Sequence, residues 1–193
     1  MKKEYVKDLV EKENLSKINF SKISIKELAG QIANTLEKAG INSDLVGGAC
    51  VSIYSKNQYL SYDLDFVIYE DTKLVKKVLS EIGFKQKGRY FSHPKCPFFV
   101  EFVSPPLAIG NEPVKKIDSL KTPFGKIQLL TPQDCVKDRL ASYFHWDDLQ
   151  ALDQAVLVYK KNKQKMVLGE LKKWAEKEKG LEKYRLFLER IKA

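Results

Sequence analysis

The chain has 193 residues, of which 44% are apolar and 31% charged, and its formal net charge is +9 at pH 7. This length allows one good core, or one core with a small helical annex, and the composition is that of an ordinary globular protein. No apolar run approaches the roughly 18 residues of a membrane-spanning helix, so a membrane protein is excluded and no membrane partner is expected.

The cysteine pattern and the start of the chain indicate the compartment. Cys50, Cys96 and Cys135 are odd in number and widely scattered, without CxxC or Cys/His metal spacing. Such cysteines are typical of reduced thiols. The start Met1–Tyr5 is charged and lacks the apolar core of a signal peptide. We therefore predict a cytoplasmic protein.

The positive charge lies largely in lysine pairs, such as Lys76-Lys77 and Lys172-Lys173. Solubility is the simplest explanation, and attraction to a polyanion such as a nucleotide or RNA is the alternative. Aromatic residues are not interleaved with basic ones along the sequence in the way that RNA-stacking modules show. The charge by itself therefore does not identify a partner.

The first two thirds of the chain alternate between helical and strand patterns. Ser24 is a helix cap, Gly40 is a stop signal, and Thr72 is expected to cap another helix. The predicted elements are a helix to Ala39, a strand over 44–46, a helix over 48–56, a strand over 64–69, a helix ending at Gly83, a strand over 84–91 and a strand over 98–103.

The character of the sequence changes after a β-hairpin-like passage over 117–129 around Gly125. Thr131 and Pro132 carry the signals of a helix start. Four helices are predicted beyond them, over 132–144, 148–161, 166–177 and 181–191. The expected organisation is an α+β core over 1–130 followed by a C-terminal helical annex over 131–193.

The most informative stretch runs from Val46 to Phe66. Gly47 and Gly48 follow a short apolar strand, and Asp63 and Asp65 stand two apart in another apolar run. Strand residues two apart point to the same face, about 6.6 Å apart. Two such carboxylates repel each other unless a cation lies between them, and glycines before a helix let backbone N–H groups approach a phosphate. A polar strand edge or a loop cap would explain one aspartate but not two.

Glu101 poses the same question in the strand over 98–103. It is either the third carboxylate of a metal cluster or the partner of a lysine or of Arg89 in a salt bridge. If its strand neighbours that of Asp63 and Asp65, Glu101 lies on the same face. Three carboxylates around two Mg²⁺ ions would serve phosphoryl-type transfer.

The order of these residues resembles the signature of the DNA polymerase β-like nucleotidyltransferase superfamily. There, a strand, a Gly-Gly or Gly-Ser pair and a helix lead to a strand with Asp-x-Asp, and a later strand carries a third acidic residue. The resemblance implies a nucleotidyltransferase-like mixed β-sheet with flanking helices. It also implies that Asp63 and Asp65 bind both Mg²⁺ ions, or Mn²⁺ in their place, and that Glu101 assists the catalytic ion or acts as a base.

The same resemblance implies a site for a nucleoside triphosphate such as ATP. Gly47 and Gly48 would lie against the triphosphate, and Ser61 stands where such proteins often have Ser or Thr. Lys137 and Arg139 are candidates for phosphate binding. Arg139 lies at the margin of an apolar stripe, where it could reach a cleft or simply pair with Asp138.

The stretch 129–143, followed by the acidic residues Asp147, Asp148 and Asp153, is similar to a helix-start element of one branch of the superfamily. That branch comprises small prokaryotic nucleotidyltransferases related to toxins of abortive-infection toxin–antitoxin pairs. The whole resemblance covers about residues 24–160. Two features depart from it, since the spacer between Gly48 and Asp63 is slightly long and Arg139 stands where lysine is common.

These expectations lead to one main function and two alternatives. The main prediction is a Mg²⁺-dependent nucleotidyltransferase that transfers NMP from an NTP to RNA, a protein or a small molecule. The first alternative is a catalytically weak module that binds nucleotide or RNA. The second is a toxin component held by an antitoxin partner.

Overall fold

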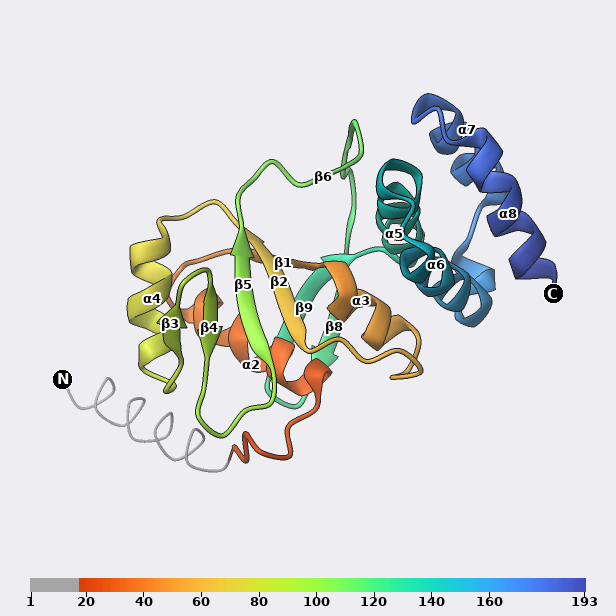
Figure 1. Ribbon diagram of the computed structural model, residues 1–193. Helices are drawn as coiled ribbons and strands as arrows, with labels where there is room; N and C mark the ends of the chain where they lie inside the picture. Colours follow the sequence, from red (N-terminus) through yellow and green to blue (C-terminus); the bar gives the residue numbers. More distant parts are fainter. Residues whose placement is uncertain (1–17) are drawn as a thin grey trace.

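The computed structural model describes residues 18–193, so the charged start Met1–Tyr5 and the rest of 1–17 lie outside the described residues. Seven strands form one sheet in the order β3-β4-β5-β2-β1-β9-β8 (Figure 1). Their bounds are β1 Ser43–Val46, β2 Asp63–Ile68, β3 Lys85–Lys87, β4 Tyr90–Ser92, β5 Phe99–Val103, β8 Ile117–Thr122 and β9 Gly125–Leu130. The β1/β9 and β2/β5 pairs are parallel and the others antiparallel, so the sheet is mixed.

Within residues 18–193, three α-helices accompany the sheet and four follow it. The first three are α2 Ile25–Lys38, α3 Gly47–Tyr54 and α4 Thr72–Ser80. The annex contains α5 Pro132–Trp146, α6 Leu149–Lys161, α7 Leu168–Lys177 and α8 Leu181–Lys192, which lie beyond one end of the sheet (Figure 1). The predicted α+β fold with a mixed sheet, flanking helices and a C-terminal helical segment is confirmed.

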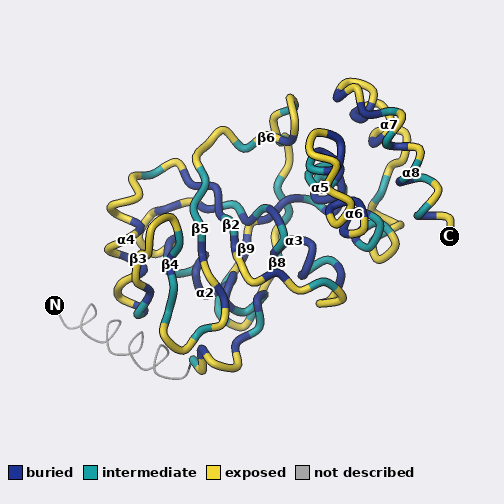
Figure 2. Tube along the Cα trace, viewed as in Figure 1, coloured by how far each residue is buried: buried dark blue, intermediate teal, exposed yellow. Residues whose placement is uncertain are grey.

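Helix α2 forms where its signals predict it. The Ser24 hydroxyl accepts a hydrogen bond from the Glu27 N–H, and the Glu27 side chain accepts one from the Ser24 N–H, which completes a capping box. Leu28, Ile32 and Leu36 form a fully buried stripe at helical spacing. The helix lies behind the sheet in Figure 1, and Figure 2 shows it among the most buried parts of the chain.

Two local predictions were wrong. The passage 84–91 is the hairpin β3–β4 rather than one strand, because Gly88 adopts a positive φ of 62° that reverses the chain. Helix α4 is capped by Asp71, whose carboxylate accepts from the Lys73 N–H, and Thr72 is the first helical residue. Ser, Thr and Asp are all good caps, and the sequence did not discriminate between the adjacent two.

The annex shares the core of the sheet. Thr131 caps α5 and Pro132 occupies its first turn, as predicted. Cys135, Val136 and Leu140 on α5 belong to the same hydrophobic cluster as the sheet residues. No helix among residues 18–193 is long and apolar enough to cross a membrane.

Candidate active site

The turn from β1 into α3 brings the chain close to β2. Val46, the last residue of β1, pairs with Asp65. Gly47 follows with a φ of 66°, and a Cβ atom on it would lie 2.5 Å from Oδ2 of Asp65. A Cβ atom on Gly48 would lie 2.8 Å from the Ser61 hydroxyl oxygen. A side chain at either position would collide with Asp65 or Ser61 unless these moved. The two glycines therefore allow the start of α3 to lie against the Asp65 carboxylate.

The parallel pairing of β2 with β5 brings three carboxylates to one face. Asp65 lies directly opposite Glu101, and Asp63 lies opposite Phe99. Directly opposed residues and residues two apart share a face of the sheet. Asp63 is exposed, whereas Asp65 and Glu101 are partly buried. The expected position of Glu101 depended on its strand lying next to that of Asp63 and Asp65. The structure shows that β2 and β5 are neighbours.

The electrostatics of this face centre on Asp65. Burial raises the pKa of its carboxyl to about 6, and repulsion by Asp63 and Glu101 adds to this effect. Arg139 acts in the opposite direction and lowers it. Asp65 is therefore a carboxylate whose ionised form would be stabilised by a cation.

Asp63 and Glu101 each have a partner. The Ser61 hydroxyl is 3.1 Å from Oδ1 of Asp63, and the Ser61 N–H donates to the Ser52 hydroxyl at 2.8 Å. Nε of Arg89 lies 3.3 Å from Oε1 of Glu101, so the salt bridge named above as the alternative for Glu101 is present. Ser61 is buried, so its hydroxyl holds the Asp63 carboxylate in one orientation.

The arrangement and donor atoms of the three carboxylates can be compared with what Mg²⁺ requires. Among residues 18–193, no three acidic, histidine or cysteine side chains are already gathered as a ligand set. Glu101 points its carboxylate to Arg89, so it would have to rotate to share a cation with Asp65. Oxygen donors on one face, completed by water and phosphate oxygens, are nevertheless the ligands that Mg²⁺ prefers. The donor set fits Mg²⁺.

The structure separates the two basic candidates on α5. Arg139 has an 18% exposed side chain, pairs with Asp138 at 2.6 Å and lies close enough to Asp65 to affect its pKa. Lys137 is two residues earlier, about 200° around the helix. Arg139 therefore lies near the carboxylates. Its ion pair with Asp138, which the sequence offered as the alternative to phosphate binding, is also present.

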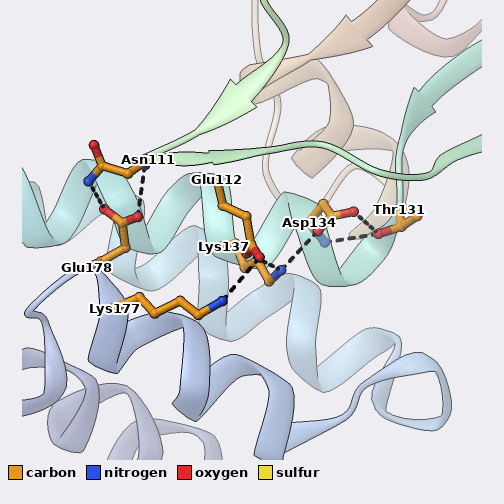
Figure 3. A network of polar contacts seen from close by, with 7 residues as sticks. All are labelled: Asn111, Glu112, Thr131, Asp134, Lys137, Lys177 and Glu178. Atoms are coloured by element: carbon orange, nitrogen blue, oxygen red, sulfur yellow. Dashed lines mark hydrogen bonds and ion pairs between the residues drawn. The ribbon is translucent and has the colours of Figure 1, made fainter.

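Lys137 points instead into a hollow between α5, α7 and the small hairpin formed by β6 Ala108–Ile109 and β7 Glu112–Pro113. It lies 3.5 Å from Glu112 and 3.5 Å from Asp134, and Lys177 lies 3.6 Å from Glu112 (Figure 3). None of these partners is one of the three carboxylates. Lys137 is held in a charge network that joins the annex to the β6–β7 hairpin.

Two aromatic side chains near the carboxylates were missed in the sequence. Tyr90 on β4 lies opposite Glu101, and Phe99 lies opposite Asp63. Phe99 precedes Glu101 by two residues, so the strand period could have placed it on this face. Tyr90 could not be placed, because the turn at Gly88 was not predicted.

No family model matches the chain, and no curated protein matches it. A solved structure of an antigenic nucleotidyltransferase-like protein from Paracoccidioides brasiliensis superposes with a TM-score of 0.54 at 14% identity, covering 83% of this chain and 91% of that one. The solution structure of the antibiotic-resistance factor ANT(2'')-Ia gives a TM-score of 0.46 at 7% identity, covering 70% and 83%. The first likeness shows that the chain has a nucleotidyltransferase-like fold.

Proposed function

We propose that this protein is a Mg²⁺-dependent nucleotidyltransferase that moves NMP from an NTP to an acceptor. The observation that carries the proposal is the meeting of Asp63, Asp65 and Glu101 on one sheet face beside the glycine turn into α3. The nucleotidyltransferase-like fold supports it. The toxin role implied by the sequence resemblance would use the same chemistry.

The reaction has a simple balance. The acceptor hydroxyl oxygen forms a bond to the α-phosphorus, the bond from that phosphorus to the β-phosphate oxygen breaks, and pyrophosphate leaves. The hydroxyl proton passes to a carboxylate or to water. Mg²⁺ held by the carboxylates would neutralise triphosphate charge and lower the pKa of the attacking hydroxyl.

The residues of the chain divide this task. Asp63 and Asp65 supply the cation ligands, and Ser61 fixes the orientation of Asp63. Glu101 joins them as a third ligand or accepts the proton. Gly47 and Gly48 let the Asp65 carboxylate and the Ser61 hydroxyl approach the start of α3 closely, where backbone N–H groups would meet the triphosphate. Arg139 supplies positive charge beside Asp65, whereas Lys137 has no part in this proposal because it is held by Glu112 and Asp134.

The Arg89–Glu101 salt bridge favours a second candidate, a binding module with little or no turnover. If Glu101 stays with Arg89, only two carboxylates face the cation. Tight nucleotide or RNA binding without Mg²⁺ dependence would then be expected in calorimetry, with no transfer.

The test compares the protein with the double variant Asp63→Asn plus Asp65→Asn. Incubation with α-labelled NTPs, Mg²⁺ and cell extract should give a labelled product with the natural protein and none with the variant. NTP binding in Mg²⁺, measured by calorimetry, should weaken at least about tenfold in the variant, because the cation loses two charged ligands. Asp153→Asn, at an exposed ion pair with Arg190 in the annex, is the matched control and should behave like the natural protein.

The proposal fails if neither binding nor labelling occurs, or if both persist unchanged in the double variant. Binding without labelling, unaffected by removal of Mg²⁺, would support the binding module instead.

A further inference from the structure

The face that carries the carboxylates continues beyond β5 onto β4 and β3. In the antiparallel pairing, Tyr90 lies opposite Glu101 and Ser92 lies opposite Phe99. On the next strand, Lys87 lies opposite Tyr90 and Lys85 opposite Ser92. All these side chains share one face because directly opposed residues do so. The face therefore passes from acidic at β2, through aromatic, to basic at the sheet edge.

The aromatic part of this face is open to a ligand. Phe99 is 46% exposed, although it is a large apolar residue that pairs with strands on both sides at the start of β5. Its ring lies 6.2 Å from that of Tyr90, measured between centroids. The guanidinium carbon of Arg89 lies 4.7 Å from the Tyr90 centroid. Tyr90 is half-buried, so the exposed Phe99 ring and the Tyr90 ring beside it, with an arginine over the latter, are suited to stacking with a planar group.

The basic part forms the edge of the sheet. All three residues of β3, including Lys85 and Lys87, are exposed. Lysines on an edge strand discourage pairing between sheets, which is their structural explanation. Here they also flank the exposed Phe99 ring and the half-buried Tyr90 ring on the same face, and the combination of stacking rings with a cationic track is typical of sites for single-stranded nucleic acid.

The geometry of transfer decides which substrate this surface would meet. In phosphoryl transfer the attacking oxygen and the leaving group lie roughly in line on opposite sides of phosphorus. The proposed function puts the triphosphate at the glycine turn, on the α3 side of Asp65, because Gly47 brings the start of α3 against that carboxylate. The attacking hydroxyl must then come from the other side, over Glu101 on β5 and towards β4.

We propose that the β3–β4–β5 surface is the acceptor subsite and that the acceptor is the end of a single-stranded RNA. Its terminal bases stack on Phe99 and Tyr90, its phosphates contact Lys85 and Lys87, and its terminal hydroxyl reaches the carboxylates. This inference rests on the proposed function, since that function assigns the two sides of the site. Duplex RNA does not fit, because its bases are already stacked and cannot cover exposed rings.

The experiment measures RNA binding without nucleotide, so that it does not depend on turnover. The probe is a short, fluorescently end-labelled single-stranded RNA, titrated with the full chain and followed by anisotropy. Phe99→Ala and Tyr90→Ala should each weaken binding by at least about fivefold, which is the loss of one stacked base. Phe99→Trp should retain binding, because it keeps a stacking ring and controls for an indirect effect on folding.

The lysines and a distant aromatic residue complete the design. Lys85→Gln plus Lys87→Gln should reduce the slope of log affinity against log salt by about 1.4, because two phosphate contacts to a single strand are lost. Tyr69→Ala removes a 63% exposed ring just after the C-terminal end of β2 and should leave RNA binding unchanged. The same RNA as a duplex should bind at least about tenfold more weakly.

Separate calorimetry of Mg²⁺–NTP distinguishes this inference from the proposed function. If the NTP binds through Asp63 and Asp65 but the RNA does not bind, or binds equally to Phe99→Ala and Tyr90→Ala, the acceptor subsite is overturned and the proposed function stands. Equal losses in Tyr69→Ala, or equal binding of duplex, also overturn it. RNA binding that depends on Phe99 and Tyr90, without any NTP binding, would show an RNA-binding surface but overturn both the nucleotidyltransferase and the role of this surface as its acceptor subsite.

Discussion

Asp65 holds the least stable charge in the described site, because burial and two neighbouring carboxylates oppose its ionisation. Its pKa of about 6 in the folded chain exceeds the ordinary aspartate value. A group with a raised folded pKa is favourable to folding when protonated. The free energy of unfolding therefore falls as pH rises from about 4 to about 6, where the unfolded chain ionises first.

Asp65→Asn removes this pH dependence and should stabilise the protein. At pH 8 the variant should exceed the natural protein by about 3 kcal/mol in the free energy of unfolding, and the difference should vanish at about pH 3, below the pKa of the unfolded chain. Urea unfolding at several pH values without divalent cations measures it. A constant difference across this range would contradict the electrostatic assignment, and Asp153→Asn serves as the surface control.

At the scale of elements, the junction of β1 and α3 depends on Gly47. The φ of 66° and the 2.5 Å approach of a Cβ atom to Asp65 leave no room for a side chain. Gly47→Ala should cost about 1–3 kcal/mol and displace the Asp65 carboxylate, so that Mg²⁺–NTP binding weakens as well.

The control for Gly47→Ala is Gly169→Ala near the start of α7. A Cβ atom there meets nothing within 4 Å, so alanine should stabilise the helix by up to about 1 kcal/mol without affecting nucleotide binding. Chemical unfolding and calorimetry measure both effects. A loss of stability in Gly169→Ala, or none in Gly47→Ala, would contradict the argument from close approach.

The elements also show how far local signals reach. The cap at Ser24, and the cap and proline at Thr131 and Pro132, were read correctly because each signal acts on its own backbone turn. The hairpin β3–β4 was missed because Gly88 could either turn a strand or sit within it. The pairing of β4 with β5 favours a turn at Gly88. That pairing depends on residues outside the local sequence, so the local sequence does not predict it.

At the scale of the whole molecule, the hairpin β6–β7 is tied to the annex by Glu178. The Asn111 N–H donates to one carboxylate oxygen of Glu178 at 2.8 Å, and the Asn111 side-chain amide donates to the other at 3.2 Å (Figure 3). Nε2 of His145 lies 3.3 Å from the same carboxylate, which is only 1% exposed. The buried Glu178 side chain, at the end of α7, thus connects the β6–β7 hairpin to α5.

Glu178→Ala should therefore loosen the contact between core and annex. We expect a loss of about 1–3 kcal/mol, because the donors of Asn111 lose a buried acceptor, together with faster proteolysis in the β6–β7 hairpin. Urea unfolding and limited proteolysis measure these effects. Glu189→Ala, at an exposed position of α8, should change stability by less than about 0.5 kcal/mol. Equal effects of the two substitutions would contradict the proposed link.

The sequence by itself determined most of the elements, the mixed α+β class and the spacing of Gly47, Asp63, Asp65 and Glu101, because helix caps and strand alternation are local properties of the chain. Only the tertiary structure decided which strands are neighbours. The β2–β5 register placed Glu101 beside Asp65, and the β3–β4–β5 register added Tyr90 and two lysines to the same face. The tertiary structure also placed Lys137 beside Glu112 and Asp134, away from the three carboxylates. Strand pairing joins residues far apart in the chain, so its outcome depends on the whole core.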